Sequence, residues 1–171
     1  MRLQNKVILI TGSVTGIGKA IAKRCVEEGA RVLIHGLEQD LGEQTVAELG
    51  AANATLVIKD LADEDAAQML VKAALDAFGK LDAVVNNAAQ VGLGNIQTTD
   101  AKWFRRMLEI NCIVPYLITQ AALPHLRETR GSVINIGSVN AWSGEPNLMP
   151  YSVSKGALMT LTRNLGDTLM R

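Results

Sequence analysis

Short apolar runs alternate along the chain with longer segments in which apolar residues recur every three or four positions. Continuous apolar runs are typical of strands covered on both faces, and the helical recurrence is typical of helices that pack on a sheet. The expected strands are Val7–Ile10, Arg31–Ile34, Thr55–Ile58, Ala83–Val85 and Ser132–Ile136. This alternation predicts an α/β fold, a doubly wound parallel sheet of the Rossmann type with helices on both faces.

The first expected helix follows the glycine-rich turn after the first strand and is stopped by Gly29. The others cover residues 38–49, 63–78, 100–126 and 151 to the chain end. Pro115 falls inside the fourth helix, where its missing backbone donor predicts a kink or a tightened turn. No repeat, low-complexity stretch or linker interrupts the pattern. We therefore expect residues 1–171 to form a single domain.

Composition and charge narrow the classes of function. The 17 basic and 17 acidic residues cancel, so neither nucleic acid nor a membrane surface is an expected partner. No apolar run approaches the roughly 18 residues that span a bilayer, and we expect no signal peptide before the first strand. Cys25 and Cys112 lie in helical patterns without metal-ligand spacing. We expect them to be buried and reduced, in a cytoplasmic protein without a bound metal.

A glycine-rich turn, Thr11-Gly12-Ser13-Val14-Thr15-Gly16-Ile17-Gly18, joins the first strand to the first helix. Gly12 suits a tight turn, Gly16 lets the backbone approach phosphates, and Gly18 lets the helix pack on the sheet. Unpaired N–H groups at a helix start bind a dinucleotide pyrophosphate well. The residues predicted to bind it are Gly12, Thr15, Gly16, Ile17 and Gly18. The alternative is a turn rich in glycine for tightness alone.

The spacing Gly-x3-Gly-x-Gly resembles the short-chain dehydrogenase/reductase family, and the resemblance runs from the first strand to the last residue. It implies an oxidoreductase that transfers a hydride between NAD(P) and a carbonyl or alcohol. By this resemblance Asp60 hydrogen-bonds the adenine amino group, the adjacent Leu61 also contacts the cofactor, and Asn87, Ala88 and Ala89 support the cofactor ribose. The alternative for Asp60 is a helix cap. Ala89 stands where Gly is usual in the family.

Asn111, Ser138, Tyr151 and Lys155 match the catalytic set of the family. Tyr151 and Lys155 are four residues apart and share one helix face. A phenol in water titrates near pH 10, and a neighbouring ammonium favours the phenolate. The resemblance implies that Tyr151 is the general acid or base, tuned by Lys155, which also binds the nicotinamide ribose.

Ser138 would hydrogen-bond the substrate oxygen, and Asn111 would hold a water that connects Lys155 to solvent. Taken singly, each of these residues has a structural explanation, because Tyr-x3-Lys is common on surface helices and a serine often ends a strand. Their order along the chain, together with the glycine turn, favours the catalytic interpretation.

The segment after the second strand decides between NAD and NADP in this family. Asp at the position of Gly36 indicates NAD, and Arg at the position of Leu37 indicates NADP; neither is present. Thr15 also stands where many NADP-dependent members carry a basic residue, so NAD is favoured. Glu38 is expected either to reach the ribose or to cap the next helix. His35 is either near the adenosine or a structural histidine.

The substrate, a small carbonyl compound or alcohol, is expected to contact Ser138, Asn140, Trp142 and Tyr151. Trp142 is equally well explained as an anchor of its own loop. Family members usually continue into a sixth strand, a lid and a seventh strand. The chain is therefore expected to be a fragment that lacks the last strands of the family fold.

Wide apolar stripes lie on Asp100–Leu126 and Tyr151–Met170. By the same resemblance they imply a homodimer or homotetramer that forms through these helices; the alternative is that both helices face the core.

Two other functions stay open besides the enzyme or an inactive fragment of it. A regulator that binds NAD(P) without chemistry has no need of all four catalytic residues. A nucleotide-sugar isomerase or dehydratase usually has Gly-x2-Gly-x2-Gly instead.

Overall fold

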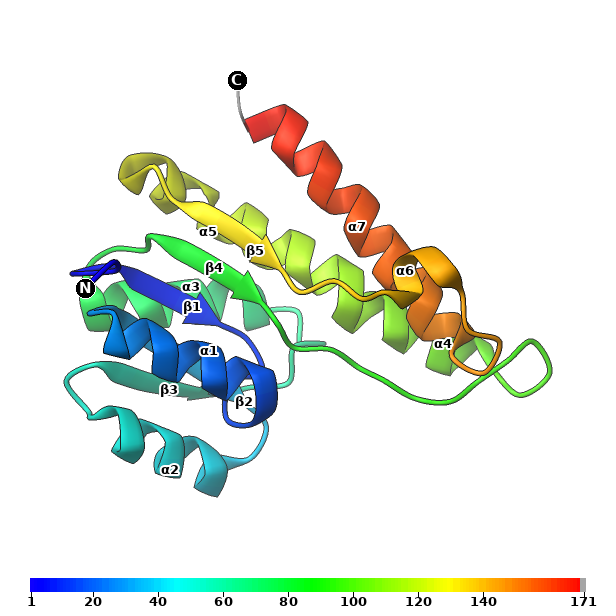
Figure 1. Ribbon diagram of the computed structural model, residues 1–171, viewed down its shortest axis with the longest axis horizontal. Coiled ribbons are helices and arrows are strands. Elements are labelled where there is room, and N and C mark those ends of the chain that lie inside the picture. Colours follow the sequence, from blue (N-terminus) through cyan, green and yellow to red (C-terminus); the bar gives the residue numbers. More distant parts are fainter. Residues whose placement is uncertain (170–171) are drawn as a thin grey trace. The chain divides into compact units, whose positions relative to one another are not determined.

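The computed structural model describes residues 1–169 (Figure 1). In chain order the elements are β1 (Val7–Ile10), α1 (Gly16–Glu27), β2 (Arg31–Gly36), α2 (Gln39–Leu49), β3 (Ala54–Ile58), α3 (Ala66–Phe78), β4 (Ala83–Asn86), α4 (Ala101–Leu108), η1 (Glu109–Ile113), α5 (Val114–Thr129), β5 (Ser132–Asn135), α6 (Asn140–Ser143) and α7 (Met149–Leu169). The chain divides into two compact units. We call residues 1–88 and 118–134 the sheet unit, and residues 89–117 with the chain from 135 onward the helical unit.

The sheet unit contains five strands in the order β3-β2-β1-β4-β5. β1 pairs in parallel with β2 and with β4, and β2 pairs in parallel with β3. All four residues of the central strand β1 are buried, which explains its unbroken apolar sequence. Helices α1 and α2 lie on one face and α3 on the other (Figure 1). The predicted doubly wound α/β fold is confirmed.

The strand order reverses beside β1, which places the glycine turn at a switch point of the sheet. From β1 the chain continues to β2 and β3 on one side, and it later returns to β4 and β5 on the other. In open α/β sheets, ligands bind at the carboxyl ends of the strands at such a point. The turn that follows Ile10 is at that end of β1.

The predicted ends of β3, β4 and β5 differ from the observed ones by one residue each, and boundaries of β2 and α3 differ by more. β2 extends to Gly36, two residues beyond the predicted end, because Val57 and Ile58 of β3 continue to pair with it. α3 begins at Ala66 instead of Asp63. The residues before it form a turn in which Lys59 pairs with both Asp63 and Asp65.

The predicted helix 100–126 is interrupted, but by a widened turn and not by a tightened one. α4 leads into the π-helix η1, and α5 then continues to Thr129. Val114 donates its N–H to the carbonyl of Glu109, five residues earlier. Pro115 has no N–H to give to the carbonyl of Asn111, so the regular α-helical ladder is broken at this point.

The last helix, α7, begins at Met149, two residues before the predicted start, and is described to Leu169. Its predicted end at Met170 and the final Arg171 lie outside the described residues. In the helical unit, α4, η1 and α6 all pack against α7. None of the helices in the described part of the chain is long and apolar enough to cross a membrane.

Cys25 and Cys112 are both free thiols, but the prediction that they are buried is wrong, because each is partly exposed. The buried positions of their helices are Gly18 and Ala22 in α1 and Ile110 and Asn111 in η1. Partial burial still raises the pKa of both thiols.

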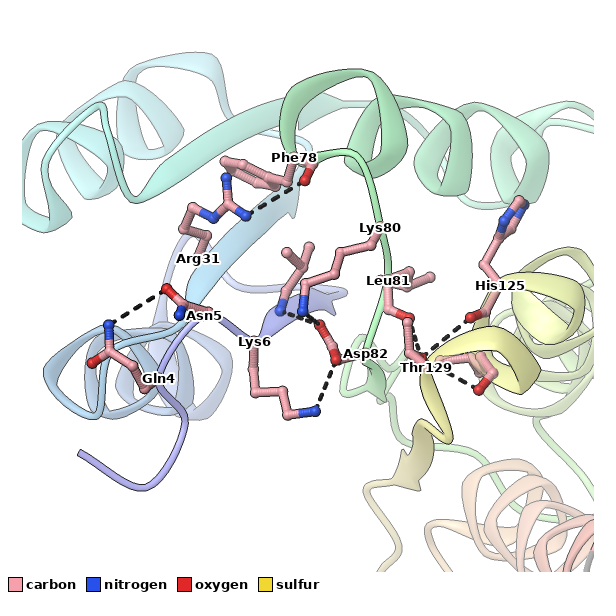
Figure 2. A network of polar contacts seen from close by, with 12 residues as sticks. Gln4, Asn5, Lys6, Arg31, Phe78, Lys80, Leu81, Asp82, His125 and Thr129 are labelled. Carbon is pink, nitrogen blue, oxygen red and sulfur yellow. Dashed lines mark hydrogen bonds and ion pairs between the residues drawn. The ribbon is translucent and has the colours of Figure 1, made fainter.

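A buried carboxylate, Asp82, lies just before β4 and binds two lysines (Figure 2). Asp82 accepts hydrogen bonds from Lys6 Nζ and from the backbone N–H of Val7, both at 2.9 Å, and pairs with Lys80 Nζ at 2.9 Å. Burial raises the pKa of Asp82, but the bonds from Lys6, Lys80 and Val7 outweigh it and hold the pKa below its usual range. The backbone of Asp82 also bonds to Val7 and Ser132.

Candidate nucleotide and catalytic sites

The glycine turn has a backbone that requires glycine at specific positions. Gly12 and Gly16 have φ angles of 61° and 56°, in the left-handed region that side chains disfavour. A Cβ at Gly12 would lie 2.9 Å from the Cα of Ala88, and one at Gly18 would collide with the Gly12 carbonyl oxygen. Gly18 therefore permits close packing against the turn itself and not only against the sheet.

Gly16 differs from the other two glycines, because its surroundings are open. A Cβ there would meet no atom of the described chain within 4 Å. Thr15, Gly16 and Ile17 are all exposed, and the Thr15 side chain makes no capping hydrogen bond to α1. The first N–H groups of a helix have no intrahelical partner and carry partial positive charge. The residues present therefore fit the pyrophosphate of a dinucleotide.

The end of β4 is bound to the same turn. Thr11 Oγ1 accepts hydrogen bonds from the N–H groups of Asn87 and Ala88, both at 3.0 Å. Asn87 Nδ2 donates in turn to the carbonyls of Thr11 and Gly12, both at 2.9 Å. The structure thus brings together predicted residues that are far apart in the sequence. Thr11 had no predicted role, and the only signal for it is its place beside Gly12 in the motif.

The segment after β2 leaves no room for a carboxylate at position 36. Gly36 is buried, and a Cβ there would lie 2.5 and 2.6 Å from the methyl groups of Val14. Leu37, the next residue, is 60% exposed. Glu38 occupies the N-cap position of α2, but its side chain makes no capping hydrogen bond, so the capping alternative is wrong.

Asp60 and Leu61 follow β3, as predicted. Asp60 Oδ1 accepts a hydrogen bond from the N–H of Ala62 at 2.9 Å, which fixes a local turn. Leu61 is buried. His35, on the neighbouring strand, accepts a hydrogen bond from Gly12 N–H on its Nδ1 atom at 3.1 Å. The two segments expected around the adenosine therefore have defined local structures within the sheet unit.

In the helical unit, α7 carries Tyr151 and Lys155 one turn apart. Lys155 Nζ lies 6.0 Å from the centre of the Tyr151 ring and donates a hydrogen bond to the carbonyl of Ile136 at 2.6 Å. Lys155 is only 2% exposed, and burial lowers the pKa of its ammonium. The expected proximity of the two residues is present.

Asn111, placed by η1, links two other segments of the helical unit. Its Nδ2 donates to the carbonyl of Gln90 at 2.8 Å and to Ser154 Oγ at 2.9 Å, and its Oδ1 accepts from Gln90 N–H at 2.7 Å. Ser154 Oγ donates to the carbonyl of Tyr151 at 2.7 Å. Ser154 was not a predicted site residue, although it lies inside the Tyr151–Lys155 motif. Gln90 follows β4, at a position that by the family resemblance lines the substrate side of the cleft, and its contact with Asn111 was not predicted.

Ser138 and its neighbours follow β5. Ser138 Oγ accepts a hydrogen bond from Asn140 N–H at 3.2 Å, at the start of the short helix α6. Trp142, on α6, is 71% exposed, and the Arg163 guanidinium of α7 lies 5.1 Å from its ring centre. This contact is of the cation–π type and favours the interpretation of Trp142 as an anchor of its loop. Ala89 is exposed and belongs to the helical unit.

Comparisons with known proteins found one matching family. Residues 6–171 match the family described as short chain dehydrogenase. An uncharacterized oxidoreductase of Thermotoga maritima is 38% identical over 168 residues, which are 96% of this chain and 66% of that protein. An L-fucose dehydrogenase of Bos taurus is 36% identical over 165 residues, or 96% of this chain and 60% of that protein.

A solved structure shows the same likeness in three dimensions. A short-chain dehydrogenase from Streptomyces avermitilis superposes with a TM-score of 0.91 at 30% identity, over 96% of this chain and 61% of that protein. This chain therefore spans between 60% and 66% of the length of these relatives.

Proposed function

The chain belongs to the short-chain dehydrogenase family, and on that premise we propose that the whole protein is an NAD(P)-dependent oxidoreductase acting on a carbonyl or alcohol. The observation that carries the proposal is the buried Lys155 beside Tyr151 on α7. The ammonium is held in its buried place by a hydrogen bond to the carbonyl of Ile136, which partly offsets the cost of burying the charge. In this place it lies close enough to the Tyr151 ring to favour the phenolate form.

In this mechanism the chain manages one proton and one developing charge. A bound nicotinamide supplies or accepts the hydride. The Tyr151 hydroxyl donates its proton to the substrate carbonyl oxygen during reduction, and in the oxidation direction the Tyr151 phenolate accepts the proton of the alcohol. The Lys155 ammonium stabilises the phenolate that remains. The Ser138 hydroxyl donates a hydrogen bond to the same substrate oxygen.

Proton supply runs through Lys155 in the proposed mechanism. The lowered pKa of Lys155 makes its ammonium a better proton donor. Both N–H bonds of the Asn111 side chain are already used by Gln90 and Ser154. We therefore assign the relay water to the backbone of Asn111 and not to its side-chain amide. The side chain of Asn111 then acts by fixing η1 to α7.

NAD is the proposed cofactor in preference to NADP. A 2′-phosphate is usually bound by an arginine or lysine, and Thr15, Gly36 and Leu37 supply no cation at the expected positions. The space that a discriminating carboxylate would need beside Gly36 is filled by Val14. The preference for NAD therefore rests on the missing cation and not on an acidic residue.

Further parts of the proposal concern partners. A small sugar or polyol substrate is supported by the L-fucose dehydrogenases among the relatives, with Asn140 and Trp142 beside it. Self-association through 100–126 and 151–170 is supported by exposed apolar side chains on these segments. These are Ile113, Tyr116, Val153 and Leu169. We place the protein in the cytoplasm, where its two free thiols suit a reducing compartment.

The test is turnover by the whole protein, with Tyr151→Phe compared with Tyr116→Phe. The two variants remove the same hydroxyl from the only two tyrosines of the chain. A panel of sugars, ketones and sugar alcohols is followed by the absorbance of NADH or NADPH. Tyr151→Phe should lower kcat by about 10² to 10⁴ with unchanged nucleotide affinity, because general acid–base catalysis contributes that much. Tyr116→Phe should remain active.

Full activity of Tyr151→Phe would contradict the assignment of the acid–base residue. Tight nucleotide binding without turnover of any compound on the panel would instead favour the regulator. The two outcomes differ because only the second leaves the wild-type protein inactive.

A further inference from the structure

His35 is joined to the glycine turn and to Lys59, the residue that follows β3, by four hydrogen bonds. Its Nδ1 accepts from Gly12 N–H at 3.1 Å, and its Nε2 lies 2.9 Å from the carbonyl of Lys59. Its backbone carbonyl accepts from Ser13 N–H at 2.7 Å, and its own N–H donates to Ser13 Oγ at 3.0 Å. The residue is only 2% exposed.

These partners specify one protonation state of the ring. A backbone N–H can only donate, so Nδ1 must carry a lone pair toward Gly12. A carbonyl oxygen can only accept, so Nε2 must carry the hydrogen toward Lys59. The ring is therefore the neutral Nε2–H tautomer. A protonated ring would present an N–H on Nδ1 directly to the N–H of Gly12.

The bonds act on the part of the turn where geometry is most restricted. Gly12 has the left-handed φ of 61° and packs against Ala88, so a rotation of its peptide would change the turn and the contact together. The N–H groups of Gly12 and Ser13 are both taken by His35. The exposed start of α1 at Gly16 and Ile17 is thereby left to face an anion.

We infer that His35, as the neutral Nε2–H tautomer, is a positioning residue that holds the phosphate-binding turn in the conformation that takes a dinucleotide. The inference rests on the proposed function, because it assumes that this turn binds the nucleotide. It acts through Gly12 and Ser13 and makes no contact with substrate. It also gives nucleotide affinity a dependence on pH.

The charges around the ring agree with a neutral state. Burial lowers the pKa of His35, and the Lys59 carbonyl and then the Asp60 charge act in the opposite direction without cancelling it. The Lys59 ammonium is paired with Asp63 and Asp65. The turn from Thr11 to Gly18 has no titratable side chain. Protonation should therefore occur below the ordinary histidine value near 6.5.

Two amide variants separate the two ring bonds. Asparagine places an amide atom where Nδ1 lies, and glutamine places one where Nε2 lies. His35→Asn can still accept from Gly12, whereas His35→Gln can still donate to Lys59. Each variant loses one ring bond, and neither amide titrates, so the pair is matched in structural cost.

The experiment titrates NAD⁺ and NADP⁺ into the whole protein by calorimetry from pH 8 to pH 5.5, and nuclear magnetic resonance follows the His35 ring. At pH 8, His35→Gln should bind about tenfold more weakly than wild type, the value of one buried hydrogen bond. His35→Asn should bind within about threefold of wild type. Wild-type affinity should fall as the ring protonates, and both variants should lack this fall.

Equal affinity of His35→Gln and wild type at pH 8 would overturn the inference while leaving nucleotide binding intact. The inference would also be overturned if the ring spectrum showed the Nδ1–H tautomer, or if the nucleotide affinity of His35→Asn fell at acid pH as that of the wild type does. Neither of these two measurements depends on a folded His35→Gln protein. A wild-type whole protein that binds neither nucleotide at pH 8 overturns the proposed function, and the inference with it.

Discussion

Asp82→Asn tests whether the carboxylate at the start of β4 stabilises the sheet unit as strongly as its contacts indicate. The Asp82 side chain is 5% exposed and receives three donors, Lys6, Lys80 and the N–H of Val7 (Figure 2). Asparagine has nearly the same shape, but it has one acceptor oxygen and no charge. The substitution therefore changes the electrostatics of the site with little change in packing.

The magnitude follows from which bonds asparagine can keep. Its oxygen can occupy the place of Oδ2, which faces Val7 N–H and Lys80. Its amide then faces Lys6, whose side chain is 47% exposed and can turn to water. One charge-assisted bond is lost and the others weaken. Bonds to charged groups contribute about 1.5 to 3 kcal/mol each, and exposure of the lysines reduces this. We expect a loss of about 2 kcal/mol.

The pH dependence has a definite sign. The pKa of Asp82 is lower in the folded chain than the value near 3.9 of an unfolded aspartate. The stabilisation is therefore complete above about pH 5 and is lost as the pH falls through the folded-state pKa. The difference in unfolding free energy between wild type and Asp82→Asn should narrow as the pH falls below about 4.

Urea unfolding followed by far-ultraviolet circular dichroism measures both quantities. Asp76→Asn is the matched control, because Asp76 pairs with Lys72 on the surface of α3 and is 62% exposed. Exposed helix pairs of this kind contribute less than about 0.5 kcal/mol. Equal effects of Asp82→Asn and Asp76→Asn at pH 7, or a gap that stays constant down to pH 3, would refute the reasoning.

Two further predictions concern cofactor choice and domain organisation. Leu37→Arg should raise NADPH affinity about tenfold with little change in NADH affinity, because it adds a guanidinium that can bind a 2′-phosphate. Fluorescence titration measures both affinities, and an equal gain in NADPH affinity from Met69→Arg on α3 would contradict the prediction. Trp103 and Trp142 both lie in the helical unit, so the predicted single domain should give coincident tryptophan-fluorescence and circular-dichroism transitions in urea. Separate transitions would indicate two independently unfolding units.

The order of strands and helices was predictable because burial imposes a regular pattern. β1 is covered on both faces and reads as an unbroken apolar run, and α3 shows the helical recurrence. The π-helix η1 was not predictable in the same way. Pro115 signalled an interruption, but whether a turn tightens or widens depends on how the freed carbonyls are bonded, and apolar spacing does not record it.

The site was predictable where a motif needs a special backbone and less so where distant groups meet. Gly12 and Gly16 have the left-handed φ values that the motif implied. The bonds from Asn87 to the turn join residues 75 and 76 positions apart, and no local pattern indicates them. The role of Gly18 was also only partly anticipated, because its closest neighbour is the turn and not the sheet.

The ring of His35 shows how contacts narrow alternatives that a sequence leaves open. Beside an adenosine site, a histidine can either contact the ligand or support the backbone. Both ring nitrogens of His35 bond to backbone groups, one on Gly12 and one on Lys59. A ligand bond to the ring would have to break one of them in a buried place, which costs about 1 to 3 kcal/mol for the group left unpaired. The supporting role is therefore favoured, and the ring must be neutral to perform it.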